Sequence, residues 1–148
     1  MEALLISACL LGAECKYSGG SNRLPEEQLA ALRRRYRLVP VCPETAGGLP
    51  VPRACSERRG ERVYNDRGED VTEAFSRGAA LALRLAERNG CRLALLKERS
   101  PSCGTRLVYD GSFSGKLIQG FGMTAERLQR AGLRLYGESE IDRLTENS

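Results

Sequence analysis

The chain has 148 residues, of which 41% are hydrophobic and 28% are charged, as in ordinary folded domains, so we expect one domain over residues 1–148. The net charge of +4 permits an anionic partner without requiring one. The sequence contains no histidine, which excludes His-ligated zinc, Ser-His and Cys-His nucleophile pairs and a histidine proton shuttle.

No segment approaches the roughly 18 consecutive apolar residues that a membrane span needs, and residues 1–6 lack the pattern of a secretory signal. We therefore expect a cytoplasmic protein without membrane contact. In a reducing compartment, six cysteines are more often free thiols or metal ligands than a disulfide framework.

The first half of the chain alternates strand and helix patterns. Residues 3–8 form an apolar run, interrupted by Ser7, that predicts a strand buried on both faces. Apolar residues at helical spacing predict a helix from Pro25 to about Tyr36, and residues 38–41 predict a second strand. Residues 45–69 carry glycines, prolines and charges without a sustained period, so we expect a long functional loop there.

The second half continues the alternation. Asp70 and Glu73 form a capping-box pattern, which predicts a helix that runs to Asn89 and Gly90. Residues 93–96 predict a third strand, and a hairpin is expected around Asp110 and Gly111. The remaining elements are a helix capped by Thr124 that ends near Gly132, a strand over 133–136 and a short helix starting at Ser139 and Asp142.

Strands that alternate with helices predict an α/β fold: a three-layer, open parallel sheet of Rossmann-like type with right-handed crossovers. The simplest strand order is 2-1-3-4. In that order the topological switch falls between the first and third strands, and the active edge is the one formed by the carboxyl ends of the strands.

Three cysteines follow three of these predicted strands: Cys9, Cys42 and Cys103. A single cysteine is often only a small buried hydrophobe, but three at one sheet edge indicate a metal centre. Three thiolates on a [4Fe-4S] cluster would leave one iron free for an exogenous ligand, and zinc with water in its fourth position is the alternative. The spacing alone does not choose between these metals.

Several ordered motifs resemble the 2-thiouracil desulfurase (desulfidase) family. They are SACLLGAECKYSGG at 7–20, PVCPE at 40–44 with GGL at 47–49 and PR at 52–53, DVTEAF at 70–75, and KERSPSCG at 97–104 with YDGSFSGK at 109–116. The resemblance implies a [4Fe-4S] cluster held by Cys9, Cys42 and Cys103, with the open iron taking the sulfur of a thiolated pyrimidine. The implied activity is a non-redox, hydrolytic desulfuration of 2-thiouracil or a related thiocarbonyl compound to uracil and sulfide.

Two catalytic residues are expected beside the cluster. Glu44, two residues beyond Cys42, is the hypothetical base that deprotonates the attacking water. Ser100, three residues before Cys103, is the second candidate, as a donor to the substrate or a proton relay. The ordinary interpretation of either residue is a cap or a turn.

The other cysteines rank lower. Cys15 is a second-rank candidate: a spare ligand, a sulfur acceptor or a loop thiol. Cys91 is expected in the core, and Cys55 departs from the family pattern and has no inherited role. Three further side chains are candidates for lining the pocket, although for each one alone ordinary loop polarity is the better explanation: Arg53, Lys97 and Tyr17.

One rival function keeps the cluster but not the catalysis. In that alternative the chain is an iron-sulfur redox-sensing or nucleic-acid-binding module that contacts its target through arginines. The mild charge does not favour nucleic acid over a small thiolated nucleobase as the partner, and the sequence does not indicate an oligomeric state.

Overall fold

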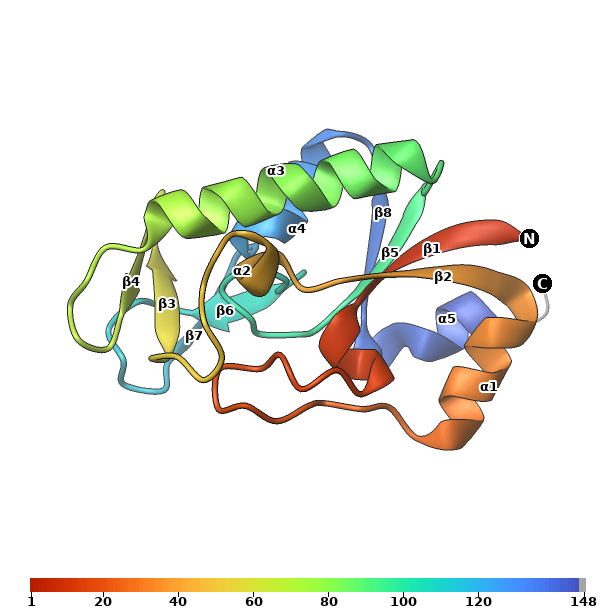
Figure 1. The fold of residues 1–148 in the computed structure, drawn as a ribbon, viewed down its shortest axis with the longest axis horizontal. Coiled ribbons are helices and arrows are strands. Elements are labelled where there is room, and N and C mark those ends of the chain that lie inside the picture. The colour runs from red at the N-terminus through yellow and green to blue at the C-terminus, as the bar shows by residue number, and fades with distance from the viewer. Residues whose placement is uncertain (147–148) are drawn as a thin grey trace.

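A parallel sheet of four strands in the order β2-β1-β5-β8 forms the centre of the protein, so the predicted order 2-1-3-4 is confirmed (Figure 1). The computed structural model describes residues 1–146, and the last two residues of the expected domain lie outside the described residues. The strands of the sheet are β1 (Glu2–Ser7), β2 (Tyr36–Val41), β5 (Leu93–Leu96) and β8 (Arg134–Gly137).

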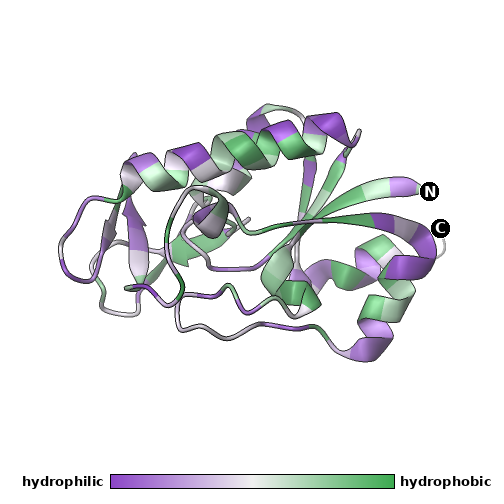
Figure 2. Cartoon of the chain, viewed as in Figure 1, coloured by the Kyte–Doolittle hydropathy of each residue, from purple (hydrophilic) through white to green (hydrophobic). Residues whose placement is uncertain are grey.

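Helices cover both faces of this sheet, which confirms the three-layer architecture (Figure 1). On one face lie α3 (Thr72–Arg88) and α4 (Met123–Arg130); on the other lie α1 (Glu26–Arg35) and the terminal α5 (Ile141–Thr145), which follows η2 (Glu138–Glu140). Within β1, Leu5 packs toward the α3 side, while Leu4 and Ile6 pack toward the α1 side. Because β1 is buried on both faces, it is apolar along most of its length (Figure 2).

Two small hairpins extend the molecule on the side away from the termini (Figure 1). The pair β6 (Leu107–Tyr109) and β7 (Leu117–Gln119) is the hairpin expected around Asp110 and Gly111. The pair β3 (Ser56–Arg59) and β4 (Arg62–Asn65) shows that the long loop expected over 45–69 contains two strands, so the absence of regular structure there is a wrong expectation. Each strand carries a buried polar residue, Glu57 in β3 and Asn65 in β4, so hydropathy does not reveal which positions of the hairpin are buried.

A short helix, α2 (Pro43–Ala46), also lies at the start of this expected loop and packs directly on α3. The contact is between backbones. A Cβ on Gly78 would overlap with the carbonyl oxygen of Pro43, and a Cβ on Gly47 would overlap with that of Ala74. Two glycines therefore allow α2 to sit against the long helix.

The predicted helix start at Asp70 is correct in part, because its side chain bonds to the first residue of the helix, whereas the cap predicted at Thr124 is wrong. Helix α3 begins at Thr72 without a capping box, and Asp70 Oδ1 accepts a hydrogen bond from the Thr72 N–H at 2.9 Å. Helix α4 begins at Met123, and the buried hydroxyl of Thr124 bonds to that of Ser102 at 2.8 Å. Among residues 1–146, no helix has the length and apolar character needed to cross a membrane.

Candidate active site

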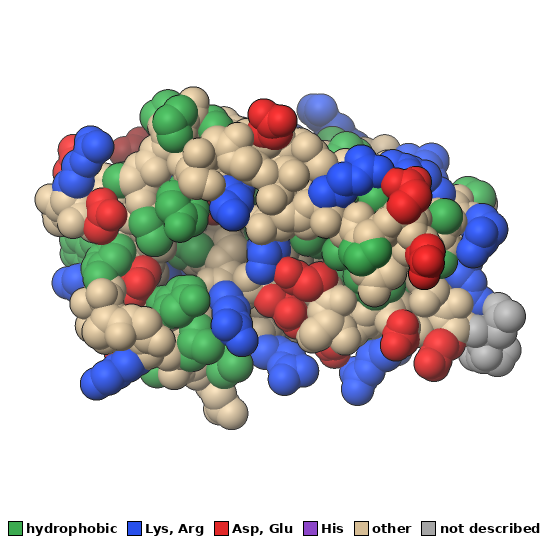
Figure 3. Space-filling view, turned by 90° about the horizontal axis from the view of Figure 1, so that it is seen from below, with side chains coloured by type: hydrophobic (Ala, Val, Ile, Leu, Met, Phe, Trp, Pro, Cys, Tyr) green, Lys and Arg blue, Asp and Glu red, His purple; other side chains and the backbone are tan. Residues whose placement is uncertain are grey.

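A cavity of about 390 Å³ lies where β1, β2 and β5 end, and its size is typical of a small-molecule site. The face seen from below is hollowed near its centre, with basic, acidic and hydrophobic side chains around the hollow (Figure 3). Five of the six cysteines line the cavity: Cys9, Cys15, Cys42, Cys55 and Cys103. Cys91 is buried in the core instead, as expected.

The sheet brings the three predicted ligands together. Strand β1 ends at Ser7 and runs into η1 (Ala8–Leu11), which carries Cys9, while Cys42 directly follows the last residue of β2. Cys103 lies in the loop after β5. Since these strands are parallel neighbours, residues that follow them meet at one edge, and the structure places all three cysteines in the same cavity.

The thiols also influence one another electrostatically. The pKa of Cys103 is raised to about 12, mainly by burial, with smaller contributions from Glu44, Cys9 and Cys42 because a second negative charge nearby is disfavoured. Burial likewise raises the pKa of Cys9, with a smaller contribution from Cys42. Cys9 and Cys103 are therefore both poorly hydrated and close enough to influence each other.

The spacing of these donors can be tested against the two metals. Within residues 1–146, no three Cys, Asp or Glu side chains are close enough to hold a single metal ion. A zinc ion requires its ligands around one centre, whereas each thiolate of a [4Fe-4S] cluster binds a different iron and the ligands stand further apart. The donor set, three thiols in one cavity, therefore fits the cluster better than zinc.

Two polar side chains that sequence reasoning missed bond to these thiols. Asn22 hydrogen-bonds to Cys9, and buried Ser7 hydrogen-bonds to Cys103; each bond lowers the pKa of its thiol. The Ser7 hydroxyl oxygen also accepts the N–H of Lys97 at 2.9 Å. Hydrogen bonds to ligand sulfurs tune iron-sulfur clusters, but a serine in a strand and an asparagine in a loop carry no sequence signal of this role.

Glu44 occupies α2 and lines the cavity, with a side chain that is 17% exposed. Burial raises the pKa of its carboxyl group, and the charge of Arg53 and the hydrogen bond from it at 3.1 Å oppose that shift. Glu44 in turn raises the pKa of Cys103, and both residues line the same cavity. A buried carboxylate with a raised pKa is suited to accept a proton near neutral pH.

Ser100 lines the cavity and also stabilises a turn. Its Oγ accepts the N–H groups of Ser102 and Cys103, both at 3.0 Å. These bonds use the lone pairs of the oxygen and not its proton. Ser100 therefore fixes the backbone beside Cys103 and can still donate to a ligand.

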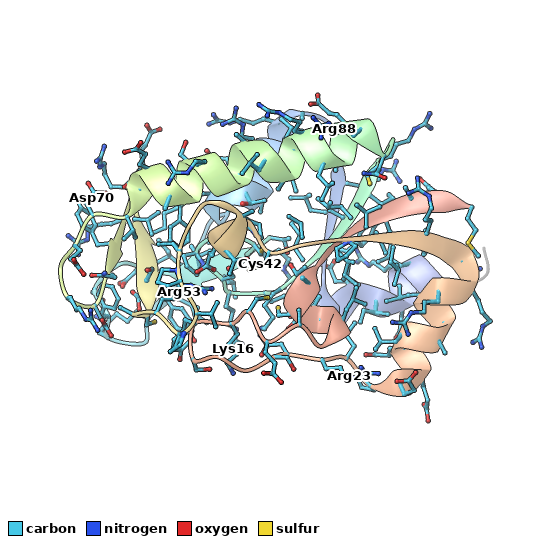
Figure 4. All side chains as sticks on the ribbon, in the orientation of Figure 1. Lys16, Arg23, Cys42, Arg53, Asp70 and Arg88 are labelled. Atoms are coloured by element: carbon cyan, nitrogen blue, oxygen red, sulfur yellow. The ribbon has the colours of Figure 1, made fainter. Side chains whose placement is uncertain are left out.

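The three candidate lining residues, Arg53, Lys97 and Tyr17, all border the cavity. The Arg53 side chain is 6% exposed, whereas Tyr17 is largely exposed. Cys15 lies beside Cys42, whose Sγ is 3.9 Å from the Cys15 carbonyl oxygen, and burial raises the pKa of Cys15 to about 12. Figure 4 shows Arg53 and Cys42 in the region between α2 and the segment that carries Lys16.

The sequence and the fold both match known proteins. Residues 4–140 match the profile of the 2-thiouracil desulfurase family. An uncharacterized protein of Bacillus subtilis (strain 168), YbbK, is 40% identical over 149 residues, which cover 94% of this chain and 97% of YbbK. The solved structure of the [4Fe-4S]-dependent thiouracil desulfidase TudS is 45% identical, with a TM-score of 0.93 over 97% of this chain and 95% of TudS. This chain belongs to the 2-thiouracil desulfurase family.

Proposed function

We propose that this protein is a [4Fe-4S]-dependent desulfurase that converts a thiolated pyrimidine such as 2-thiouracil to uracil and hydrogen sulfide. The observation that carries the proposal is the meeting of three cysteines and one buried carboxylate in a single cavity. Family membership and the likeness to TudS support it.

Cys9, Cys42 and Cys103 would hold the cluster. When bound, such a cluster supplies a Lewis-acidic iron with an open position for the thiocarbonyl sulfur. Cys9 and Cys42 lie directly beyond strands of the sheet, and the Ser100 hydroxyl, which accepts the Cys103 N–H at 3.0 Å, fixes the backbone of the loop that carries Cys103.

Glu44 is the proposed base. It takes a proton from water, and the water oxygen then bonds to the carbon that bears the sulfur. The carbon–sulfur double bond is replaced by a carbon–oxygen double bond, and the sulfur leaves with the two water protons as hydrogen sulfide. Atoms and electrons balance, so neither an oxidant nor a reductant is needed.

Ser100 is proposed to orient the pyrimidine or to relay the proton. Two backbone N–H groups of the turn fix the position of the Ser100 oxygen. The hydroxyl proton is not used by these bonds, so it is available to donate to a ligand in the cavity. A positioned hydroxyl of this kind reduces the entropy cost of orienting the substrate.

The nucleic-acid alternative receives little support from the arginine group on the β3–β4 hairpin. Arg58 pairs with Glu126 at 3.0 Å, and Arg62 pairs with Asp70. The guanidinium of Arg59 lies 4.7 Å from the centre of the Tyr64 ring. These arginines already have partners within the fold, which favours a small thiolated base over nucleic acid as the partner.

The proposal is tested by reconstituting the protein with iron and sulfide without oxygen and adding 2-thiouracil in ¹⁸O-labelled water. The expected result is equal amounts of uracil and sulfide, with one ¹⁸O atom in each uracil. Failure of the reconstituted protein to form uracil, or equal uracil formation by the metal-free protein, would reject the proposed function.

A further inference from the structure

Arg53 joins several segments of the cavity wall through one buried side chain. Its Nε donates to Glu44 Oε1 at 3.1 Å, and its Nη2 donates to the Cys15 carbonyl oxygen at 2.9 Å. Its Nη1 donates to the Pro50 carbonyl oxygen at 3.1 Å, and its backbone N–H donates to the Tyr17 carbonyl oxygen at 2.8 Å. Helix α2 and two loops therefore depend on the same residue.

These contacts restrict the guanidinium group strongly. A guanidinium is planar with its N–H groups in a fixed fork, so two bonds to carbonyls of separate segments fix its plane. The bond to Glu44 then fixes the carboxylate through Oε1 and leaves Oε2 for proton transfer. Because the Arg53 side chain is only 6% exposed, water competes little for these hydrogen bonds.

We propose that Arg53 is a positioning residue for the desulfuration. It orients the Glu44 carboxylate toward the attacking water and holds the segment that carries Cys15 against the cavity. This inference rests on the proposed function. Because the fork geometry matters as well as the charge, a lysine at position 53 replaces Arg53 only in part.

Arg58 provides a matched control elsewhere in the fold. Its side chain is 12% exposed; Nη2 donates to Glu126 at 3.0 Å, and Nη1 donates to the Phe121 carbonyl oxygen at 2.8 Å. It therefore combines a carboxylate with a backbone carbonyl, as Arg53 does, but it does not line the cavity. Its substitution measures the general cost of losing a buried arginine.

The experiment compares Arg53→Lys and Arg53→Met with Arg58→Lys and Arg58→Met after reconstitution. We expect unchanged iron content in all four, with kcat reduced about 10-fold in Arg53→Lys and about 100-fold in Arg53→Met at a nearly constant KM. The Arg58 variants should keep the wild-type kcat. Wild-type kcat in the Arg53 variants, a raised KM alone or loss of iron would overturn the positioning role.

A second readout does not depend on activity. In the metal-free protein, Arg53→Met should raise the rate of Cys15 alkylation by iodoacetamide about fivefold or more, because the segment loses its anchor. Arg58→Met should leave that rate unchanged, and an unchanged rate in Arg53→Met would overturn the inference. If the wild type forms no uracil, the proposed function fails, and the alkylation rates still decide whether Arg53 holds this segment.

Discussion

Gly78 of α3 lies directly against the carbonyl oxygen of Pro43 at the start of α2, with no space for a Cβ between them. Because Glu44 follows Pro43, this backbone contact sets the position of the proposed base relative to the long helix. Glycine inside a helix costs about 1 kcal/mol relative to alanine. The close approach of α2, and not the stability of α3 itself, therefore explains why position 78 is a glycine.

Substitution of Gly78 by alanine should destabilise the protein by about 1–3 kcal/mol, because the added methyl group overlaps with backbone that cannot move freely. Helix propensity alone predicts the opposite sign, a gain of about 1 kcal/mol. Urea unfolding measures the difference, and Arg84→Ala at an exposed position of the same helix is the control, expected within about 0.5 kcal/mol of wild type. A Gly78→Ala variant that is more stable than wild type would contradict this packing.

Substitution of a cysteine should reduce iron binding only when that cysteine is one of the three proposed ligands in the cavity. Cys9→Ala, Cys42→Ala and Cys103→Ala should each lose most of the iron and the brown colour after reconstitution, because two thiolates cannot hold the cubane stably. Cys91→Ala removes a thiol of the core and should retain wild-type iron content. Iron and acid-labile sulfide analysis distinguishes these cases, and full iron retention in Cys42→Ala would exclude it as a ligand.

Glu44→Gln should separate cluster binding from catalysis. The amide keeps the shape of the side chain but cannot accept the proton of water, so turnover should fall by about 100-fold or more. Iron content and the visible spectrum should remain those of wild type. Glu126→Gln, in the ion pair with Arg58, should retain turnover. Normal turnover by Glu44→Gln would show that another group is the base.

The buried pair Ser102 and Thr124 ties the loop of Cys103 to α4, since both residues are fully buried and their hydroxyls lie 2.8 Å apart. Thr124→Val leaves the Ser102 hydroxyl without this partner and should cost about 1–3 kcal/mol. Adding Ser102→Ala removes the remaining polar group, so the double variant should lose less stability than the two single variants predict together. Strict additivity in urea unfolding would argue against a coupled pair.

The central sheet could be predicted because its strands are buried on both faces. Such strands, β1 above all, show an unbroken apolar run that needs no knowledge of the rest of the fold. The β3–β4 hairpin could not be predicted in the same way. Glu57, on its inward face, is buried because Oε1 accepts the N–H groups of Gly111 and Phe113 at 3.0 and 3.1 Å. These partners are more than 50 residues away in the chain, so the local sequence looks like a charged loop.

The parallel topology predicted that the three cysteines lie close together, and the structure places all three in one cavity. The pairing of Arg53 with Glu44 did not follow from any local pattern, because it depends on the path of the chain between β2 and β3. The same path brings Cys55 to the cavity, although its motif gave no role to that residue. Long-range contacts of loops are the part of this site that strand and helix periodicity cannot reveal.

Mössbauer spectroscopy of protein reconstituted with ⁵⁷Fe, recorded before and after the addition of 2-thiouracil, tests the three-thiolate cluster site most directly. Three protein thiolates and one open position predict three similar irons and one distinct iron per cluster, and only the distinct iron should change when the base binds. Four equivalent irons that do not respond to the base, or protein that takes up zinc and no iron, would exclude a cluster with three thiolate ligands and one open iron.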